Sequence, residues 1–130
     1  MAENKKVKPD EPRTSPFGRK LLDDLRKAGD TGLNAMDLKV PGAKEELKKL
    51  CKLGFALSLD NSAFISMETY EKHARAILRN REPDEQFSIG DARENTGLSR
   101  KFLLPILNRM EREGYVRREG NSRVVTRDDG

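Results

Sequence analysis

The sequence has 130 residues, with 26 Lys and Arg against 22 Asp and Glu, a formal net charge of +4 and a pI near 9.3, so it can hold one ordinary domain or two small ones. No apolar run approaches the roughly 20 residues that span a bilayer, and no basic n-region precedes an apolar h-region, which argues against a membrane protein and a secreted precursor. The single cysteine, Cys51, excludes an internal disulfide and favours a reducing, cytoplasmic setting.

The first half of the chain has the element order of a winged helix. Residues 1–16 hold three prolines and little to bury, which predicts a disordered leader or linker. Ser15 and Pro16 are typical of a helix start, and Gly54 of a helix end. In chain order we expect a helix over 16–28, a short helical piece over 35–39, a helix over 43–53, and a hairpin with strands 55–59 and 63–65 around Asp60-Asn61.

The second half repeats this order. Ser66 can cap a linking helix that runs to about Arg81, and Ser88 with Asp91 resembles a capping box for the next helix. Ser99 caps a third helix that ends at Gly114. The last expected elements are an extended step over 87–89 and a hairpin with strands 115–118 and 123–126 around Gly120-Asn121.

The two halves align at a constant offset of 60 residues. Gly54-Phe55-Ala56 matches Gly114-Tyr115-Val116, and Leu47 upstream matches Leu107. We therefore predict a mainly α protein with small β-hairpins (α+β), built as two tandem winged-helix domains. The expected divisions are a leader over 1–16, a first winged helix over 17–66, a linking helix over 67–83 that is the first helix of the second unit, and a second winged helix over 84–127.

Positive charge gathers in the second copy. The segment 42–66 of the first copy has a net charge of +1, whereas the segment 97–127 of the second has +5, mostly from arginine. Guanidinium groups fork onto phosphate oxygens and stack on bases, and Arg100 and Lys101 lie where free helix N–H groups also attract anions. This pattern predicts an anion-binding surface made from a helix start and an arginine-rich hairpin. The alternative is a merely basic, solvated face.

No enzymatic motif is present in the sequence. A phosphate-binding GxxxxGK[ST] loop, a GxGxxG turn, HExxH and GxSxG are all missing, and one Cys with one His leaves almost no nucleophile–base pair. We expect Cys51 to be a small core residue and His73 to lie on the surface of the linking helix. The prediction is a protein that is not an enzyme and needs no cofactor and no metal.

Three segments of the second copy resemble a known family. They are Phe87–Arg93, Thr96–Lys101 and Gly114–Arg123, with Pro105 inside the intervening helix. An Arg before a T-G-x-S-R-K step, a proline inside the next helix and an R-R-x-G-x-x-R wing are similar to the last winged helix of bacterial SelB, the elongation factor dedicated to selenocysteine. The first copy resembles the penultimate winged helix of that factor more loosely, so the likeness covers about residues 17–127.

The resemblance implies a function in RNA recognition. It implies a C-terminal fragment, without the GTPase body, that binds the selenocysteine insertion (SECIS) hairpin of an mRNA just downstream of a UGA codon. In that family the last winged helix grips the apical stem-loop through the start of its third helix and its wing. The matching RNA-binding positions are Arg93, Ser99, Arg100, Lys101, Arg118, Asn121 and Arg123. The implied partners are an mRNA stem-loop and, through the parent factor, the ribosome, with no membrane and a monomeric state.

Two other functions remain open from the sequence. A winged-helix DNA-binding regulator would read base edges from the middle of its third helix, where Asn108 and Arg109 lie, and it would usually be a dimer. A protein-interaction scaffold would use the nearly neutral wing of the first copy.

Overall fold

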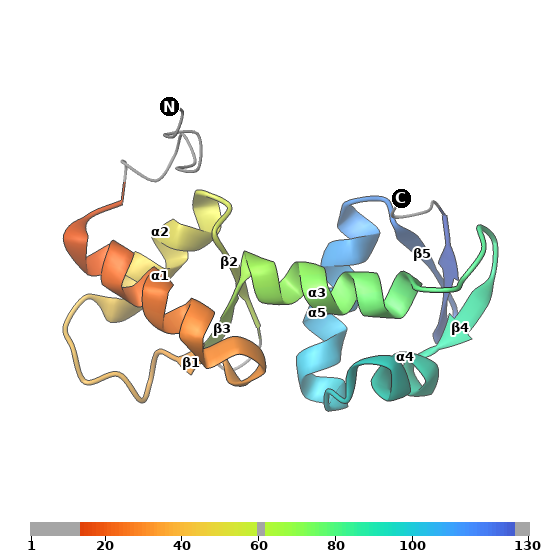
Figure 1. The fold of residues 1–130 in the computed structure, drawn as a ribbon, viewed down its shortest axis with the longest axis horizontal. Helices are drawn as coiled ribbons and strands as arrows, with labels where there is room; N and C mark the ends of the chain where they lie inside the picture. Colours follow the sequence, from red (N-terminus) through yellow and green to blue (C-terminus); the bar gives the residue numbers. More distant parts are fainter. Residues whose placement is uncertain (1–13, 60–61, 127–130) are drawn as a thin grey trace. The chain divides into compact units, whose positions relative to one another are not determined.

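The chain folds as two separate compact units. The structure, a computed structural model, describes residues 14–59 and 62–126, so most of the predicted leader and the turn at 60–61 lie outside the described residues. The division between the units falls between Met67 and Glu68. Each unit combines helices with a three-stranded antiparallel sheet (Figure 1), which confirms the α+β class and the two winged helices.

The first unit packs two helices against a small sheet. Its elements are α1 (Pro16–Ala28), the 3-10 turn η3 (Gly29–Thr31), β1 (Leu33–Asn34), α2 (Ala43–Lys52), β2 (Ala56–Ser58) and β3 (Ala63–Ser66). The strand order is β1-β3-β2. The Ser15 hydroxyl accepts a hydrogen bond from the Gly18 N–H at 2.9 Å, so the predicted cap of α1 is confirmed.

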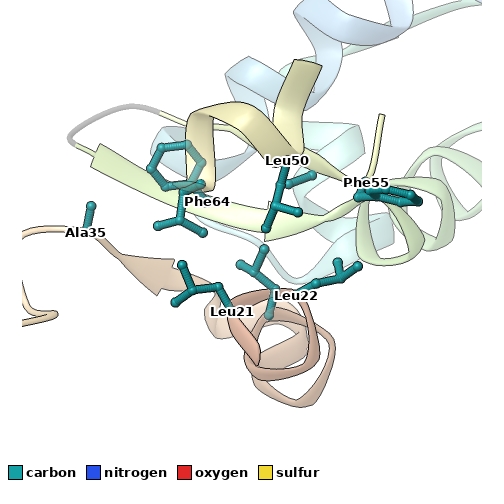
Figure 2. Close-up of a cluster of buried hydrophobic side chains, with 9 residues drawn as sticks. Leu21, Leu22, Ala35, Leu50, Phe55 and Phe64 are labelled. Atoms are coloured by element: carbon teal, nitrogen blue, oxygen red, sulfur yellow. The ribbon is translucent and has the colours of Figure 1, made fainter. Parts of the chain in front are cut away.

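Nine buried side chains form the core of this unit. They are Leu21, Leu22, Leu25, Ala35, Leu47, Leu50, Phe55, Ala56 and Phe64. Figure 2 shows side chains from α1, α2 and the sheet pointing toward one another. Cys51 packs half-buried against this cluster, in agreement with its expected role.

The region between α1 and α2 differs from the prediction. Residues 35–37 form a turn, with the Asp37 N–H donating to the Asn34 carbonyl at 3.0 Å, and residues 38–39 belong to no helix or strand, so the expected short helix is wrong. Asn34 and its neighbour Leu33 pair instead with β3 as a third strand. So short a stretch gains few helical hydrogen bonds, and the following Pro41 cannot extend it. Gly32 enters this strand at φ +68°, where a Cβ would lie 2.4 Å from the Phe64 carbonyl oxygen.

The second unit repeats the arrangement with one more helix. Its elements are α3 (Met67–Leu78, of which Met67 lies in the first unit), β4 (Gln86–Ser88), α4 (Ile89–Thr96), α5 (Arg100–Arg112), β5 (Val116–Glu119) and β6 (Ser122–Val125). The strand order is β4-β6-β5, the same pattern as in the first unit. The buried face of α5 consists of Leu103, Ile106, Leu107 and Met110, as the sequence predicts. Pro105 lies inside the helix without ending it.

His73 departs from expectation. It is 3% exposed, so its predicted place on the surface is wrong. With Tyr70, Ala74 and Ile77 it occupies the i, i+3, i+4, i+7 positions that form one stripe of α3, and all four are buried. The Tyr70 hydroxyl donates to Glu113 Oε1 at 2.7 Å, which ties α3 to the end of α5, and burial together with this bond raises the tyrosine pKa.

Two of the three caps predicted for the second half of the chain, Ser88 and Ser99, are present, while Ser66 is the last residue of β3, directly before α3. Ser88 and Asp91 exchange hydrogen bonds of 3.0 Å between each side chain and the other's backbone N–H, a capping box at the start of α4. Ser99 caps α5 by accepting from the Phe102 N–H. No helix of the described residues is long and apolar enough to cross a membrane.

Acid should weaken the α4 cap. Hydrogen bonds from Ser88 lower the pKa of Asp91 below its usual 3.8, so the carboxylate stabilises the fold above that value and this contribution is lost as the pH falls through the lower native pKa. For Asp91→Ala we expect a free energy of unfolding that differs from wild type by a constant amount above about pH 5, with the difference shrinking as the pH falls through the lowered native pKa of Asp91. Urea denaturation at a series of pH values measures this. Glu94→Ala, on the same helix, is the control, and a pH-independent difference for Asp91→Ala would contradict the assignment.

Candidate nucleic-acid interface

The start of α5 presents cations beside free backbone donors. Arg100 and Lys101 are exposed in its first turn, directly after the capping residue Ser99. The first turn of a helix leaves N–H groups without helical partners and carries the positive end of the helix dipole. This end of α5 therefore favours negatively charged groups.

The wing brings two arginines together across the sheet. Arg118 of β5 and Arg123 of β6 are direct cross-strand partners, and Phe87 of β4 faces Arg123 on its other side. Arg117 projects from the opposite face of β5, because successive side chains alternate, and its Nε donates to Glu119 Oε2 at 3.1 Å. Arg117 and Arg118 therefore project from opposite faces of the wing.

The helix start and the wing meet in one hollow of about 210 Å³, which we call the arginine pocket. Its lining residues are Ile89, Arg100, Leu104, Asn108, Arg118, Gly120, Asn121 and Arg123. Four of the seven predicted site residues, three of them arginines, therefore line the same small space. Ile89 and Leu104 add an apolar part to its wall.

Arg123 is the buried charge of the arginine pocket. It is 2% exposed; one of its terminal amino groups donates to the Ser122 carbonyl at 3.2 Å, and its Nε has no hydrogen-bond partner among the described residues. Burial lowers the pKa of Arg123, and so do the guanidinium groups of Arg118 and Arg100, whereas the carboxylate of Glu111 acts in the opposite direction. A guanidinium stays protonated at neutral pH, so the pocket holds concentrated positive charge.

Arg118 is held from the side of α5. Its Nη2 atom donates to Asn108 Oδ1 at 3.3 Å, and its Nε lies 3.9 Å from Glu111 Oε1. Asn108 and Leu104 were not expected on the anion-binding surface. Leu104 follows Arg100 by four residues and Asn108 by eight, which puts all three on one face of α5, and this spacing is the signal that could have found them.

The other three predicted site residues do not line the arginine pocket. Ser99 caps α5, and Lys101 is exposed on the first turn of that helix. Arg93 lines a separate, more open hollow of about 390 Å³ with Gly90, Glu94, Gly97 and Leu98.

The candidate base readers of the DNA hypothesis are engaged within the protein. Asn108 accepts from Arg118, while Arg109 donates through its Nε to Glu113 Oε2 at 2.9 Å and lies over the Tyr70 ring. These two side chains in the middle of α5 therefore contact other side chains of the same unit. Among the described residues there is also no group of three His, Cys, Asp or Glu side chains that could hold a metal ion.

Comparisons with known proteins agree with this architecture. Residues 80–125 match the family described as "Elongation factor SelB, winged helix". A curated selenocysteine-specific elongation factor from Haemophilus influenzae is 24% identical over 111 residues, which cover 81% of this chain and 18% of that protein. The chain thus spans about a fifth of the length of this relative.

Two solved structures are similar. A crystal structure of a bacterial selenocysteine-specific elongation factor, EF-Sec, matches with a TM-score of 0.71 and 25% identity, covering 92% of this chain and 20% of that one. The mRNA-binding domain of Escherichia coli SelB, solved in complex with SECIS RNA, matches with a TM-score of 0.64 and 19% identity over 87% of this chain and 99% of that domain, a likeness of fold. The resemblance predicted from the sequence is confirmed: this chain is similar to the C-terminal winged-helix region of SelB, the selenocysteine-specific elongation factor.

Proposed function

We propose that the chain binds the apical loop of an mRNA selenocysteine insertion hairpin through the arginine pocket of its second unit. The observation that carries this proposal is the convergence of Arg100, Arg118 and Arg123 on one hollow whose wall is partly apolar. The likeness to the mRNA-binding domain of SelB supports an RNA ligand. The GTPase activity of a whole SelB factor is not part of this proposal.

The chemistry of the pocket suits a looped-out nucleotide. The major groove of A-form RNA is too deep and narrow for a helix to read, so recognition of RNA usually relies on splayed bases and backbone shape. A hollow of about 210 Å³ with Ile89 and Leu104 on its wall can receive one base, while the guanidinium groups that line it meet the adjoining phosphates. We assign Arg118 and Arg123 to phosphates, and Arg100 with Lys101 to the region of an extruded base.

The remaining predicted residues have supporting roles in this proposal. Ser99 keeps the first turn of α5 in place so that its N–H groups face the ligand. Asn121, at the turn of the wing, offers a side-chain amide within the pocket. Arg93, which does not line the pocket, would contact phosphates that flank the loop.

Fluorescence anisotropy with a labelled stem-loop from downstream of a selenoprotein UGA codon tests the proposal. We expect wild type to prefer this hairpin to a loop-scrambled hairpin and to random duplex DNA. Arg100→Ala should weaken hairpin binding by about 1–3 kcal/mol. Affinity should also fall steeply as salt rises, because cations released from phosphates drive such binding.

The matched control is Arg112→Ala, which removes an exposed guanidinium from the other end of the same helix. It should change hairpin affinity much less than Arg100→Ala. An equal affinity for hairpin and duplex DNA would favour the DNA-binding alternative. A flat salt response would favour a protein-interaction scaffold.

A further inference from the structure

The hydrogen bond between α5 and the wing points to a further functional residue. We infer that Asn108 is a positioning residue, whose side-chain carbonyl holds the guanidinium of Arg118 over the arginine pocket for contact with RNA phosphate. The inference rests on the proposed function of that pocket. It assigns Asn108 a role that acts through Arg118 rather than on the base itself.

The contact joins two elements that are distant in sequence. Asn108 Oδ1 accepts from Arg118 Nη2 at 3.3 Å across ten residues, and both side chains line the arginine pocket. On α5, Arg100 and Leu104 precede Asn108 by eight and four residues and line the same pocket. Asn108 therefore stands on the helix face that borders the ligand site, at the point where the wing passes over it.

Arg118 needs such a restraint for two reasons, one entropic and one electrostatic. Its side chain is 54% exposed, and an unrestrained arginine loses much rotamer freedom when it is ordered. The guanidinium groups of Arg118 and Arg100 are close enough to that of Arg123 to lower its pKa, so the three groups repel one another. An acceptor on α5 offsets this repulsion and keeps Arg118 beside the pocket.

The neutrality of Asn108 matters for the ligand. A carboxylate at this position would form an ion pair with Arg118 and compete with a phosphate for the same donors. The neutral amide carbonyl orients the guanidinium without adding a charge of its own, and the ion pair between Arg118 Nε and Glu111 Oε1 is long, at 3.9 Å. Asn108 thus supplies geometry without cancelling the charge that binds the phosphate.

A double-mutant cycle on the full chain tests this role. Hairpin affinity is measured for wild type, Asn108→Ala, Arg118→Ala and the double variant. We expect Asn108→Ala to weaken binding about fivefold in the wild-type background. In the Arg118→Ala background the same change should have less than about a twofold effect, because the side chain it positions is missing.

A structural role alone would not reproduce this coupling. The salt dependence of hairpin binding should become shallower in Asn108→Ala, as in Arg118→Ala, since one phosphate contact is weakened. Thermal unfolding of Asn108→Ala should match that of Asn95→Ala, an exposed asparagine on α4 that does not line the pocket. Asn95→Ala should leave hairpin affinity unchanged.

The possible failures are distinguishable. Equal losses from Asn108→Ala in both backgrounds, or no loss in wild type, would overturn the positioning role. If wild type itself did not prefer the intact hairpin to the scrambled loop, the proposed function would fail, whatever the cycle showed.

Discussion

Arg123→Met is expected to weaken hairpin binding by about 1–3 kcal/mol and to leave the second unit as stable as wild type or more so. Arg123 is 2% exposed, and its Nε has no hydrogen-bond partner among the described residues. A buried charge that is incompletely paired costs folding free energy, and an apolar side chain of similar length often fits such a place without loss. Fluorescence anisotropy and thermal unfolding measure the two effects on the same sample.

Arg117→Met is the matched control for this prediction. Arg117 lies on the same wing, but its side chain is half-exposed and pairs with Glu119 on the face opposite Arg118. Its replacement removes the same charge from β5 and should have a much smaller effect on binding. A parallel loss of stability and affinity in Arg123→Met would show that this residue serves the fold rather than the ligand.

Truncation of one leucine in each unit should separate folding from binding. Leu47 and Leu107 are 60 residues apart, both have 0% exposure, and both lie on the helix that precedes the wing. We expect Leu47→Ala and Leu107→Ala each to cost about 2–5 kcal/mol of unfolding free energy in their own unit, from lost burial and a residual cavity. Urea denaturation followed by circular dichroism measures this cost.

Only one of the two variants should weaken RNA binding. Leu107 lies on the buried face of α5, the helix that carries Arg100 and Asn108, so its truncation should weaken hairpin binding at least about tenfold when the second unit is partly unfolded. Leu47→Ala should remain within about twofold of wild type, because the first unit does not contribute to the arginine pocket. Comparable loss in both variants would contradict a binding site confined to the second unit.

Local signals predicted most of the helices. Ser15, Ser88 and Ser99 each accept a hydrogen bond from the backbone N–H three residues later, so their effect is contained in a few consecutive positions. The 60-residue repeat likewise predicted two units of the same kind. Positive charge near a helix start and a wing was enough to expect Arg100, Arg118 and Arg123 on one surface, whereas Asn121 was expected there only from the resemblance to SelB.

Features that depend on distant partners were missed. β1 contains two residues and is stabilised by pairing with β3, so no pattern within it specifies a strand, whereas β4 overlaps the extended step expected over 87–89. His73 was placed on the surface because it follows Lys72, yet its spacing from Tyr70 and Ile77 puts it in the buried stripe. The contact of Asn108 with Arg118 depends on how the wing crosses α5, which one sequence does not reveal.

The crowding of Arg100, Arg118 and Arg123 around one hollow links occupancy to folding. When no ligand occupies that space, the three like charges repel one another and favour local unfolding that lets them separate. A multivalent anion that enters relieves part of this repulsion and binds the native state in preference to the unfolded one. The stability of the second unit would therefore rise with the concentration of such a ligand. The unoccupied molecule would be the one that unfolds most readily and is most exposed to proteolysis.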